Sequence, residues 1–264
     1  VYGTVVWRPV LEERLKRIND LILRNGYMSV VNLASELSVS DMTVRRYLEK
    51  LEQEGYVSRT HGGAYTSQVG VEIDYQLRET ARPAEKEAIG KLAYSMLRPG
   101  DSIFIDAGST ASFLAIAIDD KKRLTVVTHS IVVSKALLNK INVDTILLGG
   151  KVHSVTQSLV GPLAEEAVGR FKYTKSFLGT SGIDLVAGFT ASTLEEMPIK
   201  KIAADNSKQV IILTDSSKLH TQGLALFLKF NQVDIMITDW GIKKEDRKLL
   251  EKEGIEVICA EDVY

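Results

Sequence analysis

The segment from residue 33 to residue 64 constrains the fold of this chain more than any other segment. It reads LASELSVSDMTVRRYLEKLEQEGYVSRTHGGA. Its pattern predicts a short helix over 30–37 and a second helix over 41–54. Ser40 precedes the second helix, where a hydroxyl can accept a free first-turn N–H, and Gly55 follows it, where a left-handed residue ends a helix at little cost. Two helices joined by a short turn are therefore expected.

The second of these helices has an apolar face and a polar face. Four residues fall together at 100° per residue and are expected to be buried: Val44, Tyr47, Leu48 and Leu51. Arg45 and Arg46 fall on the other side, where Met42 also lies. An arginine can bond a guanine with two hydrogen bonds, and an apolar side chain such as Met42 can contact a thymine methyl group. This helix therefore has the features of one that reads the major groove of DNA.

A strand and a tight turn follow the second helix. Residues 56–60 alternate like a strand and lead into the basic turn His61-Gly62-Gly63. Helix, turn, helix and β-wing in this order make up the winged helix-turn-helix plan. The residues expected to contact DNA are Ser40, Met42, Thr43, Arg45, Arg46, Arg59, His61, Gly62 and Gly63. A helical hairpin that contacts another protein is the alternative, but it leaves the paired arginines and the Gly-Gly turn unexplained.

The segment SVSDMTVRRYLEKLEQEGYVSRTHGGA resembles the signature of the DeoR family of bacterial transcriptional regulators. The family pattern has valine-serine, then threonine-valine-arginine-arginine-aspartate, then an arginine and a histidine-glycine-glycine-alanine wing. This chain departs from the pattern at Tyr47, where the family usually has aspartate. The departure concerns local contacts of the recognition helix, and the resemblance implies a DNA-binding regulator.

Composition limits the classes of protein to which the chain can belong. Its 264 residues, 45% of them hydrophobic, are enough for two domains with buried cores. The net charge is −1, and residues 1–65 carry nine Lys and Arg against eight Asp and Glu. DNA binding therefore depends on where the charges lie rather than on their number. The single cysteine, Cys259, excludes an internal disulfide and a cysteine metal cluster.

The histidines and the apolar segments exclude further classes. The four histidines lack metal-ligand spacing and are expected in loops or at the surface: His61, His129, His153 and His220. No apolar run reaches the roughly 18 residues of a membrane span, and the first ten residues lack the pattern of a signal peptide. Together with the family resemblance, this predicts a cytoplasmic protein without a metal ion or a cofactor.

From residue 101 the pattern changes to short apolar runs that alternate with helical segments. The expected strands are 102–105, 124–128, 143–148, 176–178, 209–213, 233–237 and 256–258. The expected helices are 111–118, 131–139, 163–171, 194–206 and 244–253. This alternation predicts an α/β domain with a mostly parallel sheet covered on both faces. The expected organisation is a winged helix-turn-helix domain over 11–65, a linker over 66–82 and a second domain over 83–264.

In such sheets ligands bind beyond the carboxyl ends of the strands. The first strand leads into Asp106, Ala107, Gly108, Ser109 and Thr110 and then into a helix, whose N-terminus favours an anion. Neither a P-loop nor the Rossmann fingerprint is present, and a capped strand–helix turn is the alternative. The later strand ends add Thr128, Gly149, Gly150, Lys151, Gly182, Asp184, Asp215 and Lys218. Carboxylates suit sugar hydroxyls, whereas N–H groups, hydroxyls and lysines suit a phosphate, although each residue alone could be a cap or a loop residue.

The second half also resembles DeoR regulators. The segments IDAGST, VVTHS, LLGGKV, LVGP, FLGTSGID, GFT and TDSSKL, in this order, are similar to their sensor domain, which in turn resembles ribose-5-phosphate isomerase. The resemblance, which covers about residues 11–239, implies a repressor of a carbohydrate-utilisation operon that a phosphorylated sugar or polyol releases. It carries effector-binding roles onto Lys86, Asp106, Gly108, Ser109, Thr110, Thr128, Gly149, Gly150, Gly182, Asp184, Lys200, Asp215 and Lys218.

An enzyme, a sugar-phosphate isomerase with an attached DNA-binding domain, is the alternative to a regulator. Isomerisation moves a proton between adjacent carbons and needs a positioned base. The isomerase pattern has two aspartates, but the matching segment 181–184 has a single acid, Asp184. We therefore expect binding without catalysis and assign no catalytic residue. Because one winged domain reads only a few base pairs, a homodimer or homotetramer on repeated operator half-sites is expected.

Overall fold

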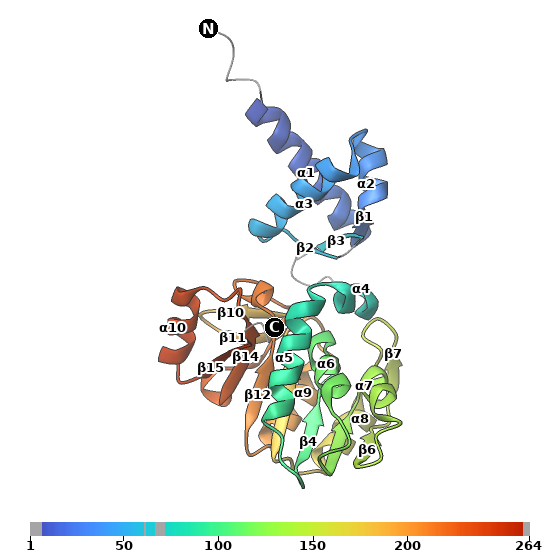
Figure 1. Cartoon of the computed structure of the whole chain (residues 1–264), viewed down its shortest axis with the longest axis vertical. Helices are drawn as coiled ribbons and strands as arrows, with labels where there is room; N and C mark the ends of the chain where they lie inside the picture. Colours follow the sequence, from blue (N-terminus) through green and yellow to red (C-terminus); the bar gives the residue numbers. More distant parts are fainter. Residues whose placement is uncertain (1–6, 61, 67–71, 261–264) are drawn as a thin grey trace. The chain divides into compact units, whose positions relative to one another are not determined.

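The computed structural model of the chain describes residues 7–60, 62–66 and 72–260. The chain consists of two compact units, Val1–Ala81 and Arg82–Tyr264, and each has buried hydrophobic clusters of its own (Figure 1). His61, one of the residues expected to contact DNA, lies outside the described residues. Within those ranges, no helix has the length and apolar character that crossing a membrane requires.

The N-terminal unit is a winged helix-turn-helix, as the sequence predicts. Its elements are α1 (Trp7–Asn25), β1 (Tyr27–Ser29), α2 (Val30–Leu37), α3 (Asp41–Gln53), β2 (Val57–Arg59) and β3 (Gly63–Thr66). Strand β3 pairs antiparallel with both β1 and β2. Ile18, Leu33 and Leu48 share one buried cluster, which packs the three helices together. Strand β1 was not predicted, because three residues are too few to show a period. α1 begins at Trp7, before residue 11, at which the domain was expected to start.

Both ends of α3 have the caps that the sequence predicts. Ser40 is extended (φ −72°, ψ 154°), and its Oγ accepts a hydrogen bond from the backbone N–H of Thr43 at 3.4 Å. Gly55 beyond the other end has φ 81°, in the left-handed region that glycine enters without strain. The four residues predicted for the apolar face are all buried: Val44, Tyr47, Leu48 and Leu51.

The segment expected as a linker, 66–82, contains a short helix. α4 (Tyr75–Thr80) has Asp74 as its N-cap, and the carboxylate of Asp74 accepts a hydrogen bond from the N–H of Gln76 at 2.8 Å. Tyr75 is buried. Residues 75–80 of the expected linker are therefore helical.

A seven-stranded sheet forms the centre of the second unit (Figure 1). Its strands, in spatial order, are β15 (Glu256–Ala260), β14 (Ile235–Asp239), β12 (Val210–Leu213), β9 (Lys175–Gly179), β4 (Ser102–Ile105), β5 (Leu124–Thr128) and β6 (Val143–Leu147). Every neighbouring pair is parallel. The predicted parallel sheet is therefore confirmed, and each strand coincides with an expected one apart from small differences at the ends.

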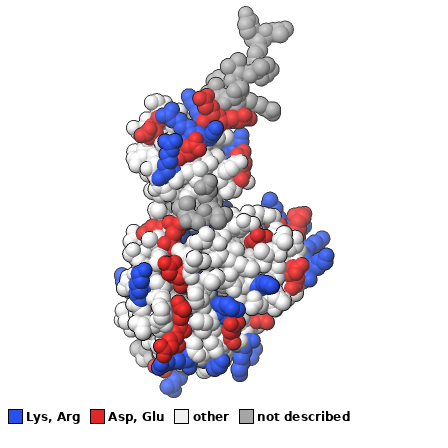
Figure 2. All heavy atoms as spheres, turned by 180° about the vertical axis from the view of Figure 1, so that it is seen from behind, with Lys and Arg blue, Asp and Glu red and all other residues white. Residues whose placement is uncertain are grey.

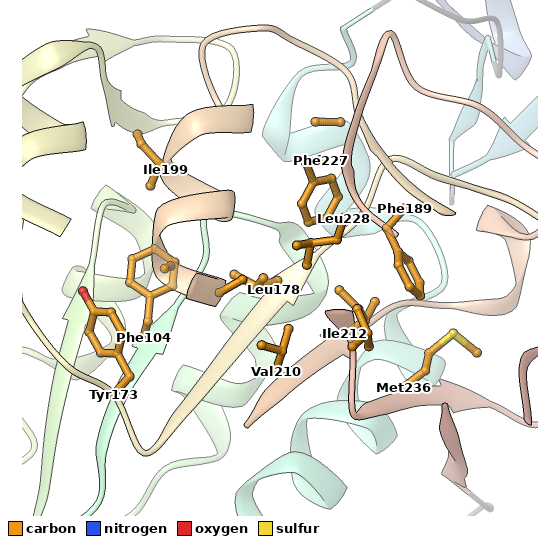
Figure 3. Packing of buried hydrophobic residues seen from close by; sticks show 14 of the residues in the cluster. Phe104, Tyr173, Leu178, Phe189, Ile199, Val210, Ile212, Phe227, Leu228 and Met236 are labelled. Carbon is orange, nitrogen blue, oxygen red and sulfur yellow. The ribbon is translucent and has the colours of Figure 1, made fainter. Parts of the chain in front are cut away.

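Helices cover both faces of this sheet. α5 (Pro83–Ser95), α6 (Ser109–Ala117) and α7 (Ile131–Leu137) pack on one face, and α8 (Pro162–Gly169), α9 (Met197–Asp205) and α10 (Lys244–Lys252) on the other. Because side chains alternate along a strand, Ile103 and Ile105 belong to the first core and Phe104 to the second. Figure 3 shows part of the second core, where Phe104 lies beside Tyr173 with ring centroids 5.6 Å apart.

The strand order places a topological switch point between β4 and β9. From β4 the chain proceeds outward to β5 and β6, and it then returns to β9 on the other side of β4. At such a point the crossovers leave in opposite directions and open a crevice at the carboxyl ends of the strands. Five short strands were not predicted, the hairpin β7 (Lys151–His153) and β8 (Ser158–Val160) and the small sheet β10 (Gly182–Asp184), β11 (Gly188–Ala191) and β13 (Ala225–Leu228).

Candidate functional site

The outer face of α3 presents the residues expected to read DNA. Arg45 and Arg46 are exposed, and Met42 is 81% exposed. The guanidinium of Arg46 lies 5.9 Å from the ring centroid of Tyr47, whose hydroxyl accepts a hydrogen bond from Arg14 Nη1 at 3.4 Å. Tyr47 thus belongs to the core between α1 and α3, at the position where the family pattern has aspartate, whereas both arginines lie on the exposed face.

Several other residues expected to contact DNA have structural bonds of their own. Ser40 Oγ and Thr43 Oγ1 lie 3.0 Å apart in the cap of α3. The carbonyl of Gly62 accepts the N–H of Val30 at 2.8 Å. A Cβ on Gly63 would lie 2.2 Å from the carbonyl oxygen of Met28, so only glycine allows β3 to pair with β1.

Arg59 joins the wing to the recognition helix. Its backbone N–H and its Nε donate to the carboxylate of Glu52 at 2.9 and 2.8 Å. Figure 2 shows that blue and red side chains lie side by side on the visible face of the N-terminal unit, rather than in one basic patch. The arrangement agrees with the near-neutral charge of residues 1–65.

In the second unit, Asp106 is the centre of a buried polar cluster at the carboxyl end of β4. Its Oδ2 accepts hydrogen bonds from the N–H of Gly179 at 2.8 Å and from the ammonium group of Lys200. Its Oδ1 lies 3.1 Å from Nε2 of His129. Lys200 also donates to the carbonyl of Gly179 at 3.1 Å. Asp106 thus bonds to residues of β9 and α9 and contacts the residue after β5, at the switch point of the sheet.

The surroundings of Asp106 favour its ionised form. Burial alone would raise the pKa of this carboxyl, but the charge of Lys200 and the contact with His129 outweigh burial and hold the pKa below its usual range. Both carboxylate oxygens contact protein groups, so Asp106 connects β9, α9 and the residue after β5 at this edge of the sheet.

The first turn of α6 follows this cluster directly. Gly108 is its N-cap, and a Cβ on Gly179 would lie 3.4 Å from the Cα of Gly108, so the two glycine backbones approach closely. Among the described residues, neither the Ser109 nor the Thr110 hydroxyl has a hydrogen-bond partner, although both residues are mostly buried. The first N–H groups of a helix have no partner within the helix, so together with these hydroxyls they make a site that suits an anion.

A second cluster surrounds Asp215 at the carboxyl end of β12. The carboxylate accepts the N–H of Ser217 at 3.1 Å and lies 3.9 Å from Nε of Arg82. Burial alone would raise the pKa of Asp215, but Lys218 and the buried Lys86 lower it, and Arg82 contributes in the same direction. Three cationic side chains therefore gather around one carboxylate at the edge where ligands bind.

Other predicted site residues do not join these clusters. Thr128 Oγ1 donates to the carbonyl of Ile105 at 2.7 Å and accepts the N–H of Ser130 at 3.0 Å, so it closes the end of β5. Asp184 accepts the N–H groups of Val186 and Ala187 at 2.8 and 3.1 Å, which makes it a turn residue between β10 and β11.

Four predicted residues remain, and backbone contacts require glycine at two of them. A Cβ on Gly150 would lie 2.8 Å from the carbonyl oxygen of Val160, and one on Gly182 would lie 2.5 Å from that of Thr221. Gly149 has open space around it, and Lys151 is exposed on β7. No contact joins these four residues to Asp106 among the described residues.

Sequence reasoning missed His129, Gly179 and Arg82. The histidines were expected in loops or at the surface, and His129 does lie in the short connection between β5 and α7, but it is 0% exposed and its Nδ1 lies 3.1 Å from the carbonyl oxygen of Leu159. Its place directly after Thr128 at a strand end was the available signal. Arg82 has φ 49° just before α5, and no local pattern indicates that it approaches Asp215.

Two protein-family models match the chain. The DeoR-like helix-turn-helix domain matches residues 14–68, and the DeoR C terminal sensor domain matches residues 81–240. Among solved structures, ribose 5-phosphate isomerase A from Methanocaldococcus jannaschii aligns at 16% identity with a TM-score of 0.38, over 51% of this chain and 53% of that chain. Translation initiation factor eIF-2B from Pyrococcus horikoshii OT3 aligns at 14% identity with a TM-score of 0.46, over 83% and 69%.

Relatives of similar length cover nearly the whole chain. The uncharacterized HTH-type transcriptional regulator YulB of Bacillus subtilis is 34% identical over 249 residues, 94% of this chain and 96% of its own length. The HTH-type transcriptional regulator GlpR of Haloferax volcanii is 32% identical, over 93% and 96%. The lactose phosphotransferase system repressor of Staphylococcus aureus is 31% identical, over 93% and 98%. The chain therefore belongs to the DeoR family of DNA-binding, HTH-type transcriptional regulators.

Proposed function

We propose that this regulator represses a carbohydrate-utilisation operon and is released from operator DNA by a phosphorylated sugar or polyol. Family membership accounts for DNA binding and regulation, whereas repression and the phosphorylated effector are the proposal. The Staphylococcus aureus relative is named a repressor of the lactose phosphotransferase system, which supports repression of sugar-related genes. A homodimer or homotetramer would bring the two recognition helices that paired half-sites require.

The observation that carries the effector proposal is the set of anion-favouring groups at the carboxyl edge of the sheet. The first turn of α6 offers N–H groups with the hydroxyls of Ser109 and Thr110, and the Asp215 cluster offers Lys86 and Lys218. β9 is the single strand between β4 and β12, so two strand spacings, roughly 10 Å, separate the two groups. A phosphate at one group and the carbon chain of a sugar reaching toward the other fit this span.

The proposal includes binding without turnover. An isomerase needs a positioned base, and the segment that matches the isomerase pattern offers Asp184 alone. Its carboxylate is used by the N–H groups of Val186 and Ala187 and by Gln222 Nε2 at 2.6 Å. A carboxylate held by three donors in a turn is poorly suited to remove a proton from a substrate.

The test measures operator binding by the full chain with and without candidate effectors. Operator DNA is first selected from a random pool, and its affinity is then measured with ribose 5-phosphate, fructose 6-phosphate and glycerol 3-phosphate. At least one is expected to weaken operator binding and to stabilise the protein by about 2.7 kcal/mol at 100 times its dissociation constant.

The unphosphorylated counterparts, ribose, fructose and glycerol, serve as controls. If they bind and release DNA as well as the phosphorylated compounds, the phosphate has no role. If a phosphorylated sugar is isomerised at a measurable rate, the protein is an enzyme as well as a regulator.

A further inference from the structure

Glu196 is a buried acid whose carboxylate has no partner among the described residues. It is 6% exposed, and its carboxylate makes no hydrogen bond or ion pair with any described residue. Its backbone is bonded at both groups, since the N–H donates to Thr193 Oγ1 at 3.4 Å and the carbonyl accepts the N–H of Lys200 at 3.2 Å. The carboxylate oxygens are not completely sealed from solvent. A ligand that displaces water from this carboxylate must offer it a hydrogen-bond donor, because a buried charge without a partner is costly.

The helical geometry of α9 sets the direction of this side chain. Glu196 has φ −81° and ψ −27°, so it already follows the helical path, and its carbonyl accepts the N–H of Lys200 at 3.2 Å. Residues four apart share one face of a helix. Glu196 therefore lies on the same face as Lys200, whose ammonium group reaches Asp106.

Glu196 also lies on the open side of that contact. α9 leads back to the start of β12, so its first residues are at the carboxyl edge of the sheet. Glu196 precedes Lys200 by one turn and is nearer to this edge. It thus lies at the edge of the crevice between β4 and β9, where a ligand at the first turn of α6 would extend.

We propose that Glu196 determines effector specificity by accepting a hydrogen bond from a hydroxyl group of the effector. This assignment rests on the proposed function, in which the phosphate binds at the first turn of α6. A carboxylate repels phosphate but is a strong acceptor for hydroxyls. The oxygens of Asp106 already contact His129, Gly179 and Lys200, whereas the carboxylate of Glu196 has no such partner among the described residues. Glu196 would therefore add a hydroxyl acceptor to the effector-binding residues that the family resemblance implies.

The test compares Glu196→Gln with Glu195→Gln in the full chain. Glu195 is the exposed neighbour and provides a matched control with the same change of charge. Dissociation constants are measured by calorimetry for inorganic phosphate, ribose 5-phosphate, fructose 6-phosphate and glycerol 3-phosphate. For the phosphorylated compound that wild type binds best, Glu196→Gln is expected to weaken binding about tenfold, because a charge-assisted bond becomes a neutral one. Affinity for inorganic phosphate should change less than twofold, and Glu195→Gln should match wild type throughout.

The possible failures are distinguishable. If wild type binds none of the three organic phosphates, the proposed function fails and the role of Glu196 with it. If wild type binds one and Glu196→Gln binds it equally well, only the role of Glu196 is overturned. An equal loss of affinity for inorganic phosphate, with a lower melting temperature, would instead make Glu196 a structural residue. Isomerisation by wild type that Glu196→Gln abolishes would make the carboxylate a base and overturn the binding role.

Discussion

The ammonium group of Lys200 donates a hydrogen bond to the carboxylate of Asp106, which lies 94 residues earlier in the chain, and both side chains are buried. The bond joins α9 to the end of β4 across β9. Between β4 and β9, the order in which the chain adds strands to the sheet changes from one side to the other. Asp106 also holds the turn that leads into α6. A single buried ion pair thus fixes the spacing of the elements that form the proposed effector site.

Removing one partner of this pair should destabilise the protein. Lys200→Met leaves the buried carboxylate without its cation, and the expected loss is about 3–5 kcal/mol in the free energy of unfolding. The measurement is urea unfolding of the full chain. Lys201→Met is the matched control, because Lys201 pairs with Asp205 at 3.7 Å on the exposed side of the same helix and should contribute less than about 1 kcal/mol. Equal effects of the two substitutions would contradict the role of the buried pair.

Stability should fall at acidic pH for the same reason. The pKa of Asp106 is lowered by Lys200 and His129 against the effect of burial, and that of Asp215 is lowered by Lys218 and Lys86. A carboxyl with a lower pKa in the folded state stabilises the protein above its unfolded pKa, about 3.9. That stabilisation is lost as pH falls toward the folded pKa. The urea midpoint should therefore be flat from about pH 7 to 5 and fall below about pH 4.5. A midpoint that stays constant down to pH 3 would contradict the assignment.

The sequence predicts the elements of the sheet well because their signals are local. β4 and β5 have the predicted bounds, since each is a continuous run of apolar and β-branched residues flanked by turn residues. The partners of Asp106 could not be predicted in the same way. His129 and Lys200 are 23 and 94 residues away, and only the order of the strands brings them together. The same holds for Glu196, which in sequence is one of two adjacent glutamates in a polar segment.

Arg46 should read a base rather than only the DNA backbone. It is exposed on α3, and no described contact other than the ring of Tyr47 holds it, so Arg46→Ala should leave the fold intact. Operator affinity should fall by about 1–3 kcal/mol, with relaxed preference at one base pair, as measured by binding to a set of single-base operator variants. Arg24→Ala, an exposed arginine at the end of α1, is the control and should bind like wild type. Wild-type affinity of Arg46→Ala would show that α3 does not read bases through this residue.

Arg59 should contribute equally to the binding of every operator sequence. Arg59→Ala is expected to weaken binding evenly across operator variants, since phosphate contacts carry no base information. The structure adds a second substitution, because Glu52 accepts both the backbone N–H and the Nε of Arg59. Glu52→Ala should release the wing from α3 and produce the same even loss, although Glu52 repels DNA and its removal alone would favour binding. A gain in affinity for Glu52→Ala would show that the wing needs no such support.

Lys86 should transmit effector binding to the DNA-binding unit. Effector and operator can influence each other only if each prefers a different arrangement of the linked domains. Lys86 lies in the first turns of α5, directly after the connection between the two units. Its charge lowers the pKa of Asp215 at the proposed effector site. Lys86→Ala is therefore expected to leave operator affinity near wild type without effector but to reduce release by the phosphorylated sugar that wild type binds best.

Lys218→Ala should have the same effect, because the charge of Lys218 also lowers the pKa of Asp215, from the turn after β12. Lys91→Ala, at the exposed side of α5, is the control and should be released like wild type. If Lys86→Ala binds the effector normally and is released from operator as readily as wild type, the coupling must run through another element.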